Sequence, residues 1–201
     1  MSPRGRRPGG VDTRASIVEA ARTDFAAQGY DATSVRGVAR RAGVDPALVH
    51  HYFGGKAALF AAVMDIPANP AVLIGRVVEG PREQVGERLV RAFLTAWDTA
   101  EGQQRFSALI RSAVTHEEAT RVLREFLTRE VFGRVVDAMA GEDSGETRDE
   151  LELRAGLAAS QMVGLALMRY IVRFPAVVGA SHDDLVAQLA PTLQRYLAPE
   201  A

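Results

Sequence analysis

The segment SVRGVARRAGVDPALVHHYF, residues 34–53, restricts the fold of this chain more than any other stretch of its sequence. Apolar residues recur at helical spacing over 35–42 and again over 46–53, and Gly43 lies between the two runs. Glycine adopts the left-handed conformation at low cost, so Gly43 is suited to end the first run in a tight turn. The pattern predicts two short helices joined by a sharp turn.

Four further residues of this segment have the properties that such a turn requires. Asp45 is a good N-cap, and Pro46 suits the first position of the second helix. Ala39 is small where the two helices approach, and Val49 is a branched apolar residue that would fill the seam between them. Two amphipathic helices around a glycine rarely meet all these conditions by chance, so we predict a helix-turn-helix.

Helical periodicity also dominates the rest of the chain, and no convincing run of strand-like alternation appears. The predicted fold class is all-α: an N-terminal three-helix helix-turn-helix domain, followed by a helical C-terminal domain that dimerises through a four-helix bundle. The first predicted helices cover residues 12–28, 35–42 and 46–53, and they are followed by a helical stretch from 56 that is interrupted around 66–70. Later helices are predicted over 81–99, 103–114, 115–140, 148–174 and 182–197. A capping box at 115–118 would start the helix that ends at 140, and Pro191 would kink the last one.

Charge is distributed unevenly along the chain. Residues 1–56 hold nine basic and five acidic side chains, a balance of +4, whereas residues 57–201 hold fifteen basic and twenty acidic ones, a balance of −5; together these give the net charge of −1. A basic head on an acidic body suits a protein that touches a polyanion at one end only. We expect a disordered basic arm over 1–10, a DNA-binding domain over 11–56, and a ligand-binding and dimerisation domain over 57–201.

Several other classes of protein fit the sequence poorly. The chain has no cysteine, and it carries none of the glycine-rich, nucleophile or phosphate-loop motifs of common enzymes, so we predict no catalytic activity and no cofactor. His50 and His51 are adjacent and point about 100° apart on a helix, so they cannot share a metal ion. The longest apolar stretch is too short and too polar for a membrane span. We expect a cytoplasmic protein.

Residues 11–63 resemble the DNA-binding domain of the TetR family of repressors. The resemblance rests on IVEAARTDFAAQGYDATSVRGVARRAGVDPALVHHYFGGKAALF, and its most specific elements are Phe25-x-x-x-Gly29-Tyr30, Thr33-Ser34-Val35-Arg36, Ala42-Gly43-Val44 and Tyr52-Phe53-x-x-Lys56-x-x-Leu59. It implies a sequence-specific regulator that binds double-stranded operator DNA and is released from it by a small-molecule effector. The remainder of the chain is similar to the family in the number and lengths of its helices.

The resemblance also implies which residues contact DNA. The helix over 46–53 would enter the major groove, whose width fits a helix. Phosphate contacts are expected from Thr33, Ser34 and Lys56, and Arg36 of the same motif is expected to bind DNA. In the helix itself, apolar base contacts are expected from Pro46, Ala47 and Leu48, and a polar base contact from His51. His50 and Tyr52 would meet phosphates. Two departures from the family pattern occur: His50 stands where Tyr is usual, and Gly54-Gly55 replaces a capping turn before Lys56. The basic arm over 4–10 either lies in a flanking minor groove or is a solvated tail.

The helix predicted over 148–174 is apolar nearly all round, because Leu153, Leu157, Met162, Leu165, Met168 and Val172 cannot share one face. Such a helix must be covered on both sides. We predict that it pairs with the helix over 182–197 (Leu185, Leu189, Leu193, Tyr196, Leu197) in a four-helix interface with a second copy. Full burial inside one subunit is the alternative. A two-fold dimer would read a palindrome with its recognition helices one DNA turn apart.

Large, soft side chains in the body are the candidates for effector contacts: Phe93, Trp97, Phe106, Met139 and Met162, with Arg111 and Gln161 as polar anchors. Ordinary core packing is the alternative for each of them, and residues of this kind serve it more often. Two further functions stay open, a DNA-binding dimer without effector control and a nonspecific DNA-packaging protein. The packaging function requires a strongly basic chain, which the net charge of −1 disfavours.

Overall fold

The computed structural model describes residues 12–66, 70–140 and 146–198, and the regular elements in these ranges are all helical, as predicted. The basic arm over 1–10 lies outside them. In chain order the elements are α1 Thr13–Ala32, α2 Val35–Ala42, α3 Pro46–Phe53, α4 Lys56–Val63, α5 Pro70–Val78, the 3₁₀ turn η1 Arg82–Gln84, α6 Val85–Trp97, α7 Ala100–Thr115, α8 Glu117–Phe126, the π turn η2 Leu127–Phe132, α9 Gly133–Met139, α10 Arg148–Ala166, the π turn η3 Leu167–Ile171, α11 Pro175–Gly179 and α12 His182–Leu197.

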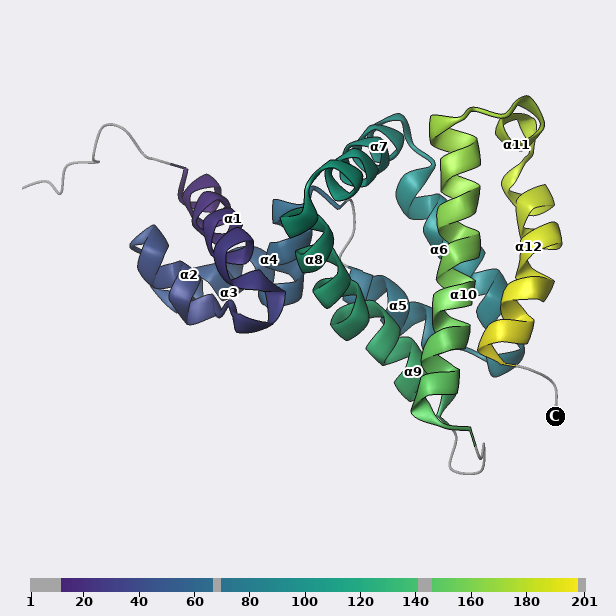
Figure 1. The fold of residues 1–201 in the computed structure, drawn as a ribbon, viewed down its shortest axis with the longest axis horizontal. Coiled ribbons are helices and arrows are strands. Elements are labelled where there is room, and N and C mark those ends of the chain that lie inside the picture. The colour runs from purple at the N-terminus through teal and green to yellow at the C-terminus, as the bar shows by residue number, and fades with distance from the viewer. Residues whose placement is uncertain (1–11, 67–69, 141–145, 199–201) are drawn as a thin grey trace, which may run out of the picture.

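These helices form a head, α1 to α4, and a larger body, α5 to α12 (Figure 1). Helices α8 and α9, with η2 between them, run as one rod from the head to the N-terminal end of α10 (Figure 1). On the far side of the body, α12 packs along α6 and against α10. Its closest approach to α6 is at Gly86, where a Cβ atom would lie 2.4 Å from the carbonyl oxygen of Ala190.

The helix-turn-helix forms as predicted, and its turn is held by local hydrogen bonds. Gly43 is left-handed with φ of 68°, and the N–H of Val44 donates to the Ala39 carbonyl at 3.0 Å. The Asp45 carboxylate accepts from the N–H of Ala47 at 2.8 Å, which caps α3. Ala39 and Val49 are fully buried in the seam between the helices. The residue types around the turn therefore determine its geometry.

Helix α1 breaks where glycine predicts that it should end. Gly29 has φ of 84° and ψ of 177°, after which one more turn reaches Ala32. The hydroxyl of Thr33 donates to the Gly29 carbonyl at 2.7 Å, and Ser34 then caps α2 by accepting from the N–H of Gly37. The break directs the chain from α1 into the helix-turn-helix.

The core of the head is completed by the body. It consists of apolar residues from α1 to α4 together with Val122 and Phe126 of α8. Four rings form its centre: the centroid of Phe126 lies 4.5 Å from that of Phe60 and 5.3 Å from that of Tyr30, and Phe25 stacks on Tyr30 at 5.7 Å. Because Phe126 is fully buried among head residues, α8 and the head share one packed core.

Three predicted helix boundaries are wrong. The helix predicted over 148–174 ends at Ile171, because η3 widens its last turn and Arg173 adopts a positive φ of 56°. The helix predicted from residue 81 begins as a 3₁₀ turn and becomes α-helical at Val85. The capping box predicted over 115–118 does not form: His116 is the N-cap of α8 and makes no side-chain capping bond. By contrast, α12 starts with a complete capping box between Ser181 and Asp184.

The apolar residues of α12 are also placed differently from the prediction. Leu185, Leu193 and Leu197 are buried in the core of their own subunit, where α12 packs on α6 and α10. They are therefore not available to a second copy. The exposed positions of α12 are small or polar, among them Ala187, Gln188 and Pro191.

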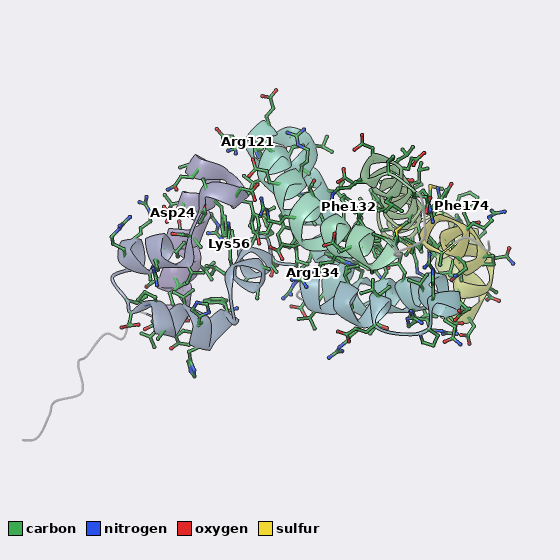
Figure 2. All side chains as sticks on the ribbon, turned by 90° about the horizontal axis from the view of Figure 1, so that it is seen from below. Asp24, Lys56, Arg121, Phe132, Arg134 and Phe174 are labelled. Atoms are coloured by element: carbon green, nitrogen blue, oxygen red, sulfur yellow. The ribbon has the colours of Figure 1, made fainter. Side chains whose placement is uncertain are left out.

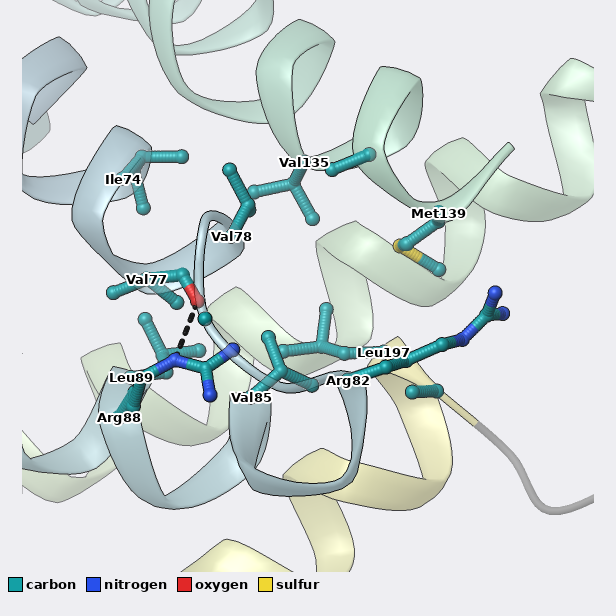
Figure 3. Close-up of a pocket in the computed structure, with 13 residues that line it drawn as sticks. Ile74, Val77, Val78, Arg82, Val85, Arg88, Leu89, Val135, Met139 and Leu197 are labelled. Atoms are coloured by element: carbon teal, nitrogen blue, oxygen red, sulfur yellow. Dashed lines mark hydrogen bonds between the residues drawn. The ribbon is translucent and has the colours of Figure 1, made fainter. Parts of the chain in front are cut away.

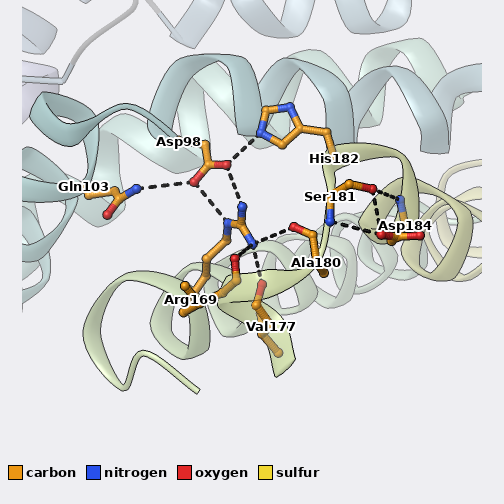
Figure 4. A network of polar contacts seen from close by, with 9 residues as sticks. Asp98, Gln103, Arg169, Val177, Ala180, Ser181, His182 and Asp184 are labelled. Atoms are coloured by element: carbon orange, nitrogen blue, oxygen red, sulfur yellow. Dashed lines mark hydrogen bonds and ion pairs between the residues drawn. The ribbon is translucent and has the colours of Figure 1, made fainter. Parts of the chain in front are cut away.

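A polar network joins the end of α6, η3 and the start of α12 (Figure 4). The Asp98 carboxylate, which follows α6, accepts two hydrogen bonds from the guanidinium of Arg169 in η3, at 3.0 and 2.9 Å. It also contacts Nε2 of His182 at 2.7 Å, at the start of α12. The hydrogen bonds from Arg169 hold the pKa of Asp98 below its ordinary range. Both side chains of the Asp98–Arg169 pair are about nine-tenths buried.

We expect Asp98→Asn to lower the free energy of unfolding by about 3 kcal/mol at pH 7, because it leaves the Arg169 cation buried without its counter-ion. Since the folded pKa of Asp98 is depressed, the wild-type advantage should persist from neutral pH down to about pH 4 and shrink below it, as Asp98 becomes protonated. Urea denaturation across this pH range measures both effects. Asp183→Asn, which breaks the exposed pair with Arg91, is the matched control and should cost less than about 1 kcal/mol. An equal loss in both variants would contradict the buried role of Asp98.

We expect Gly43→Ala to destabilise the protein by about 1–2 kcal/mol through backbone strain alone. A Cβ atom at Gly43 meets nothing within 4 Å, so the cost arises from the left-handed φ and from no steric clash. Gly43→Asn is the control, because asparagine tolerates this conformation and should recover most of the loss. Thermal unfolding of the three proteins tests the idea, and alanine and asparagine variants of equal stability would refute it.

Candidate DNA-binding face and ligand cavity

Helix α3 presents six of its residues on the surface of the head. Pro46, Ala47, Leu48, His50, His51 and Tyr52 are exposed, whereas Val49 among them is completely buried. Burial of Val49 fixes the rotation of the helix, and the caps at Asp45 and Gly54 fix its ends. An exposed, rigidly held helix of this kind has the width to enter a major groove.

The side chains at the end of α3 are aromatic and pack on one another. The rings of His51 and Tyr52 meet edge to face at 5.4 Å between centroids. Next to them, the guanidinium of Arg14 lies 5.2 Å from the centroid of Phe53, which attaches the start of α1 to the end of α3. These contacts reduce the freedom of the exposed rings before any ligand arrives.

Helix α2 adds positive charge that the sequence prediction covered only in part. Arg36 is exposed, as a DNA-binding residue has to be, and Arg40 one turn later is exposed on the same side. A shallow depression beside them is lined by Ser34, Gly37, Arg40 and Arg41 of this segment and by Asp24 and Gln28 of α1. The i, i+4 spacing of Arg36 and Arg40 is the signal that could have identified Arg40 from the sequence.

Two predicted phosphate contacts are engaged inside the protein. The Thr33 side chain is 3% exposed and its hydroxyl bonds to the Gly29 carbonyl, so it is not free to reach a phosphate. The ammonium of Lys56 donates to the Asp31 carbonyl at 3.1 Å and lies 4.4 Å from the centre of the Tyr30 ring. Burial lowers the pKa of Lys56. Figure 2 shows Lys56 on the inner side of the head, toward the body.

Polar contacts from the α8 rod hold the broken end of α1. The Glu125 carboxylate accepts from the N–H of Tyr30 at 2.7 Å and from that of Asp31 at 3.4 Å. Burial pushes the pKa of Glu125 upward, but the Tyr30 N–H, Arg121 and the Asp31 N–H together outweigh this and leave it below its ordinary value. In addition, the Tyr30 hydroxyl donates to Glu130 at 2.9 Å. The head is thus attached to the body by both an apolar core and a set of hydrogen bonds.

The body contains a cavity of about 250 Å³ whose lining side chains are all apolar. Four of the predicted effector contacts line it: Phe93, Trp97, Phe106 and Met162. Met139 lines a smaller neighbouring cavity instead, shown in Figure 3. The two predicted polar anchors, Arg111 and Gln161, line neither cavity. The sequence missed the wall that η2 contributes, Leu127, Val131 and Phe132.

An apolar stripe lies open along α10 and η3. Its large side chains are Leu153, Leu157, Leu167 and Ile171, between 38% and 64% exposed, and Gly164 continues the same helical spacing. Met162 and Leu165 lie on the opposite face and are buried in the body. The helix is therefore apolar on two faces, as predicted, and one of these faces is uncovered in the single chain.

Residues 12–66, 70–140 and 146–198 hold no group of three His, Cys, Asp or Glu side chains that could bind a metal ion. None of their helices is long and apolar enough to cross a membrane.

Two family models match the chain. The model described as "Tetracyclin repressor-like, C-terminal domain" matches residues 83–197, and "Bacterial regulatory proteins, tetR family" matches residues 17–63. Among curated relatives, the HTH-type transcriptional regulator BetI of Brucella anthropi is 28% identical over 166 residues, which cover 73% of this chain and 82% of the relative. The HTH-type transcriptional repressor Rv3405c of Mycobacterium tuberculosis is 33% identical over 110 residues, 52% of this chain and 56% of the relative.

Solved structures resemble the chain over nearly its whole length. A TetR-family regulator from Streptomyces coelicolor A3 is 35% identical and aligns with a TM-score of 0.50 over 96% of this chain and 98% of its own. NalD, the secondary repressor of the MexAB-OprM multidrug efflux pump in Pseudomonas aeruginosa, has 21% identity and a TM-score of 0.50 over 94% and 97%. The second of these supports the fold alone.

Proposed function

Since the chain belongs to the TetR family of bacterial transcriptional regulators, we propose that it is a repressor whose homodimer binds a palindromic operator and leaves it when a small molecule fills the body cavity. The observation that carries the proposal is the outward-facing α3, held by a buried Val49 and capped at both ends. In this proposal residues 11–56 bind DNA, and residues 57–201 bind the ligand and dimerise.

Operator contacts are assigned from what the head exposes. Ala47 and Leu48 at the start of α3 offer apolar surface to thymine methyl groups, and His51 offers ring nitrogens to base edges. Arg36 and Arg40 of α2 meet phosphates, together with His50 and Tyr52. The capped start of α2 at Ser34 adds N–H groups that favour an anion.

Dimerisation is assigned to the exposed stripe on α10 and η3. A soluble protein rarely leaves a run of large apolar side chains such as Leu153, Leu157 and Leu167 uncovered unless another surface meets it. A two-fold axis near Gly164 would let two α10 helices approach closely. Such a dimer would present two α3 helices to successive turns of DNA.

Release from DNA is assigned to the α8–η2 segment. Leu127, Val131 and Phe132 of η2 line the cavity, while Glu125 and Glu130 of the same segment bind the end of α1. A ligand that moves η2 therefore changes the position of the head. By linkage, a ligand that weakens operator binding must itself bind the DNA-bound protein more weakly by the same factor.

Alanine substitutions should separate base contacts from phosphate contacts. His51→Ala is expected to cost about 1–3 kcal/mol on the preferred operator and to relax specificity at one position. Arg36→Ala should weaken binding to every sequence alike and reduce the slope of log K against log salt by about 1. Arg111→Ala, which removes an exposed arginine from the body, is the control and should change neither quantity. The measurement is fluorescence anisotropy with operator and scrambled duplexes over a range of salt concentrations. Equal binding to both duplexes by the unaltered protein would contradict sequence-specific recognition.

A charge placed in the α10 stripe should separate the dimer. Leu157→Arg is expected to give monomers at micromolar concentration and to lose tight operator binding, because an unpaired charge would be buried in the interface. Val114→Arg places the same charge on another exposed apolar position, 80% exposed on α7, and should stay dimeric. Sedimentation equilibrium reports the oligomeric state. Dimers of normal affinity in the Leu157 variant would place the interface elsewhere.

A further inference from the structure

A second cavity, of about 110 Å³, adjoins the large one and contains a charged group (Figure 3). The two cavities share four apolar lining side chains, Ile74, Leu89, Val135 and Leu197. The charged group is Arg88 of α6, which lines the smaller cavity. Arg82 lines it too, but it is exposed and its side chain extends away from Arg88 (Figure 3).

The guanidinium of Arg88 is held by backbone carbonyls. Its Nε donates to the carbonyl oxygen of Val77 at 2.8 Å, and its Nη1 donates to that of Pro81 at 2.6 Å. Its Nη2 is buried and has no hydrogen-bond partner among residues 12–66, 70–140 and 146–198, and no carboxylate in those ranges pairs with Arg88. Arginine remains protonated in proteins, so Arg88 is a fixed cation with a free donor.

The position of the guanidinium is fixed by close packing. A Cβ atom at Gly80 would lie 2.6 Å from Cζ of Arg88, so the chain bears glycine where its backbone passes over the charged group. Two hydrogen bonds and this contact leave the guanidinium little freedom to turn toward solvent. A partly buried cation without a counter-ion carries a desolvation cost, and an anion bound at the buried Nη2 would relieve it.

The large cavity sets the chemistry of the rest of the ligand. All its lining side chains are apolar, and they include the rings of Phe93, Trp97 and Phe106. An apolar cavity of about 150 Å³ is known to bind benzene, so the volume of about 250 Å³ fits a body of roughly ten carbon atoms. A hydrocarbon chain or a fused pair of rings would satisfy this volume.

We propose that the ligand of this regulator is an amphiphilic monocarboxylate, with its apolar body in the large cavity and its carboxylate accepting a hydrogen bond from Nη2 of Arg88. The inference rests on the proposed function, because it names the class of effector. A neutral ligand would leave the charge of Arg88 without a counter-ion, and an amine would face a like charge. To span both cavities the ligand must move the shared side chains, which include Val135 of α9, the helix that continues the rod from the head.

The chain carries its own reporter for this binding. Trp97 is the single tryptophan and lines the large cavity, so its fluorescence should change when the cavity fills. The full-length protein is titrated with decanoate, with its neutral counterpart 1-decanol, and with 2-naphthoate. We expect both carboxylates to bind the unaltered protein at least tenfold more tightly than decanol, since a charge-assisted hydrogen bond is lost in the alcohol. The ratio of the affinities for decanoate and 2-naphthoate shows whether the large cavity prefers a hydrocarbon chain or a fused pair of rings.

Arg88→Met keeps the apolar stem and removes the charge. It should weaken decanoate binding at least tenfold while decanol binding changes little, and Arg88→Lys should recover part of the preference for the acid. Arg91→Met, at an exposed arginine one turn along α6, is the matched control and should behave as the unaltered protein. The comparison of acid with alcohol needs no variant, so it stands even if Arg88→Met fails to fold. Decanol binding as tightly as decanoate, or full decanoate affinity in a folded Arg88→Met variant, would overturn the proposal.

Operator binding is measured on the same samples without ligand. Specific operator binding combined with no preference for carboxylates refutes the ligand class and leaves the proposed repressor function intact. Preference for carboxylates without specific operator binding supports the ligand class and refutes the proposed repressor function.

Discussion

The contact between the α8 rod and the head is the interaction on which the rest of this structure depends. Phe126 is buried against Phe60 and Tyr30, and Glu125 accepts the backbone N–H groups that the break at Gly29 leaves at the end of α1. Removing a buried phenylalanine from a core costs about 3–5 kcal/mol, a large part of the 5–15 kcal/mol that stabilises a typical domain. The orientation of the proposed DNA-binding face is therefore determined by a helix of the body.

The same rod connects this contact to the cavity. Within the π turn η2, Glu130 bonds to the Tyr30 hydroxyl while Val131 and Phe132 line the cavity. A π turn carries one more residue than an α-helical turn, and such turns are frequent at functional sites. Residues that are adjacent in sequence therefore reach two regions of the protein with different chemistry. This arrangement gives the proposed effector a short mechanical path to the operator.

Short-range rules explain what the sequence could predict. The cap at Asp45, the left-handed Gly43 and the buried Val49 depend on neighbours within a few residues, and all were found as predicted. Prediction failed where a partner distant in sequence decides the outcome. The start of α8 has the residues of a capping box without its bonds, and the leucines of α12 are covered by α6 of the same chain. Likewise, Lys56 is occupied by Asp31 and Tyr30, which no periodicity reveals.

The shared core around Phe126 has a consequence for engineering chimeric regulators. A graft that transfers only residues up to the end of α4 would lack Val122 and Phe126, and the recipient body would have to supply side chains of matching shape at those two positions. A graft that also carries the segment from Glu117 to Phe132 would bring its own packing surface and the Glu125 bonds. The portable unit of this protein is therefore discontinuous in sequence, and a junction chosen at a loop after α4 would cut through its interior.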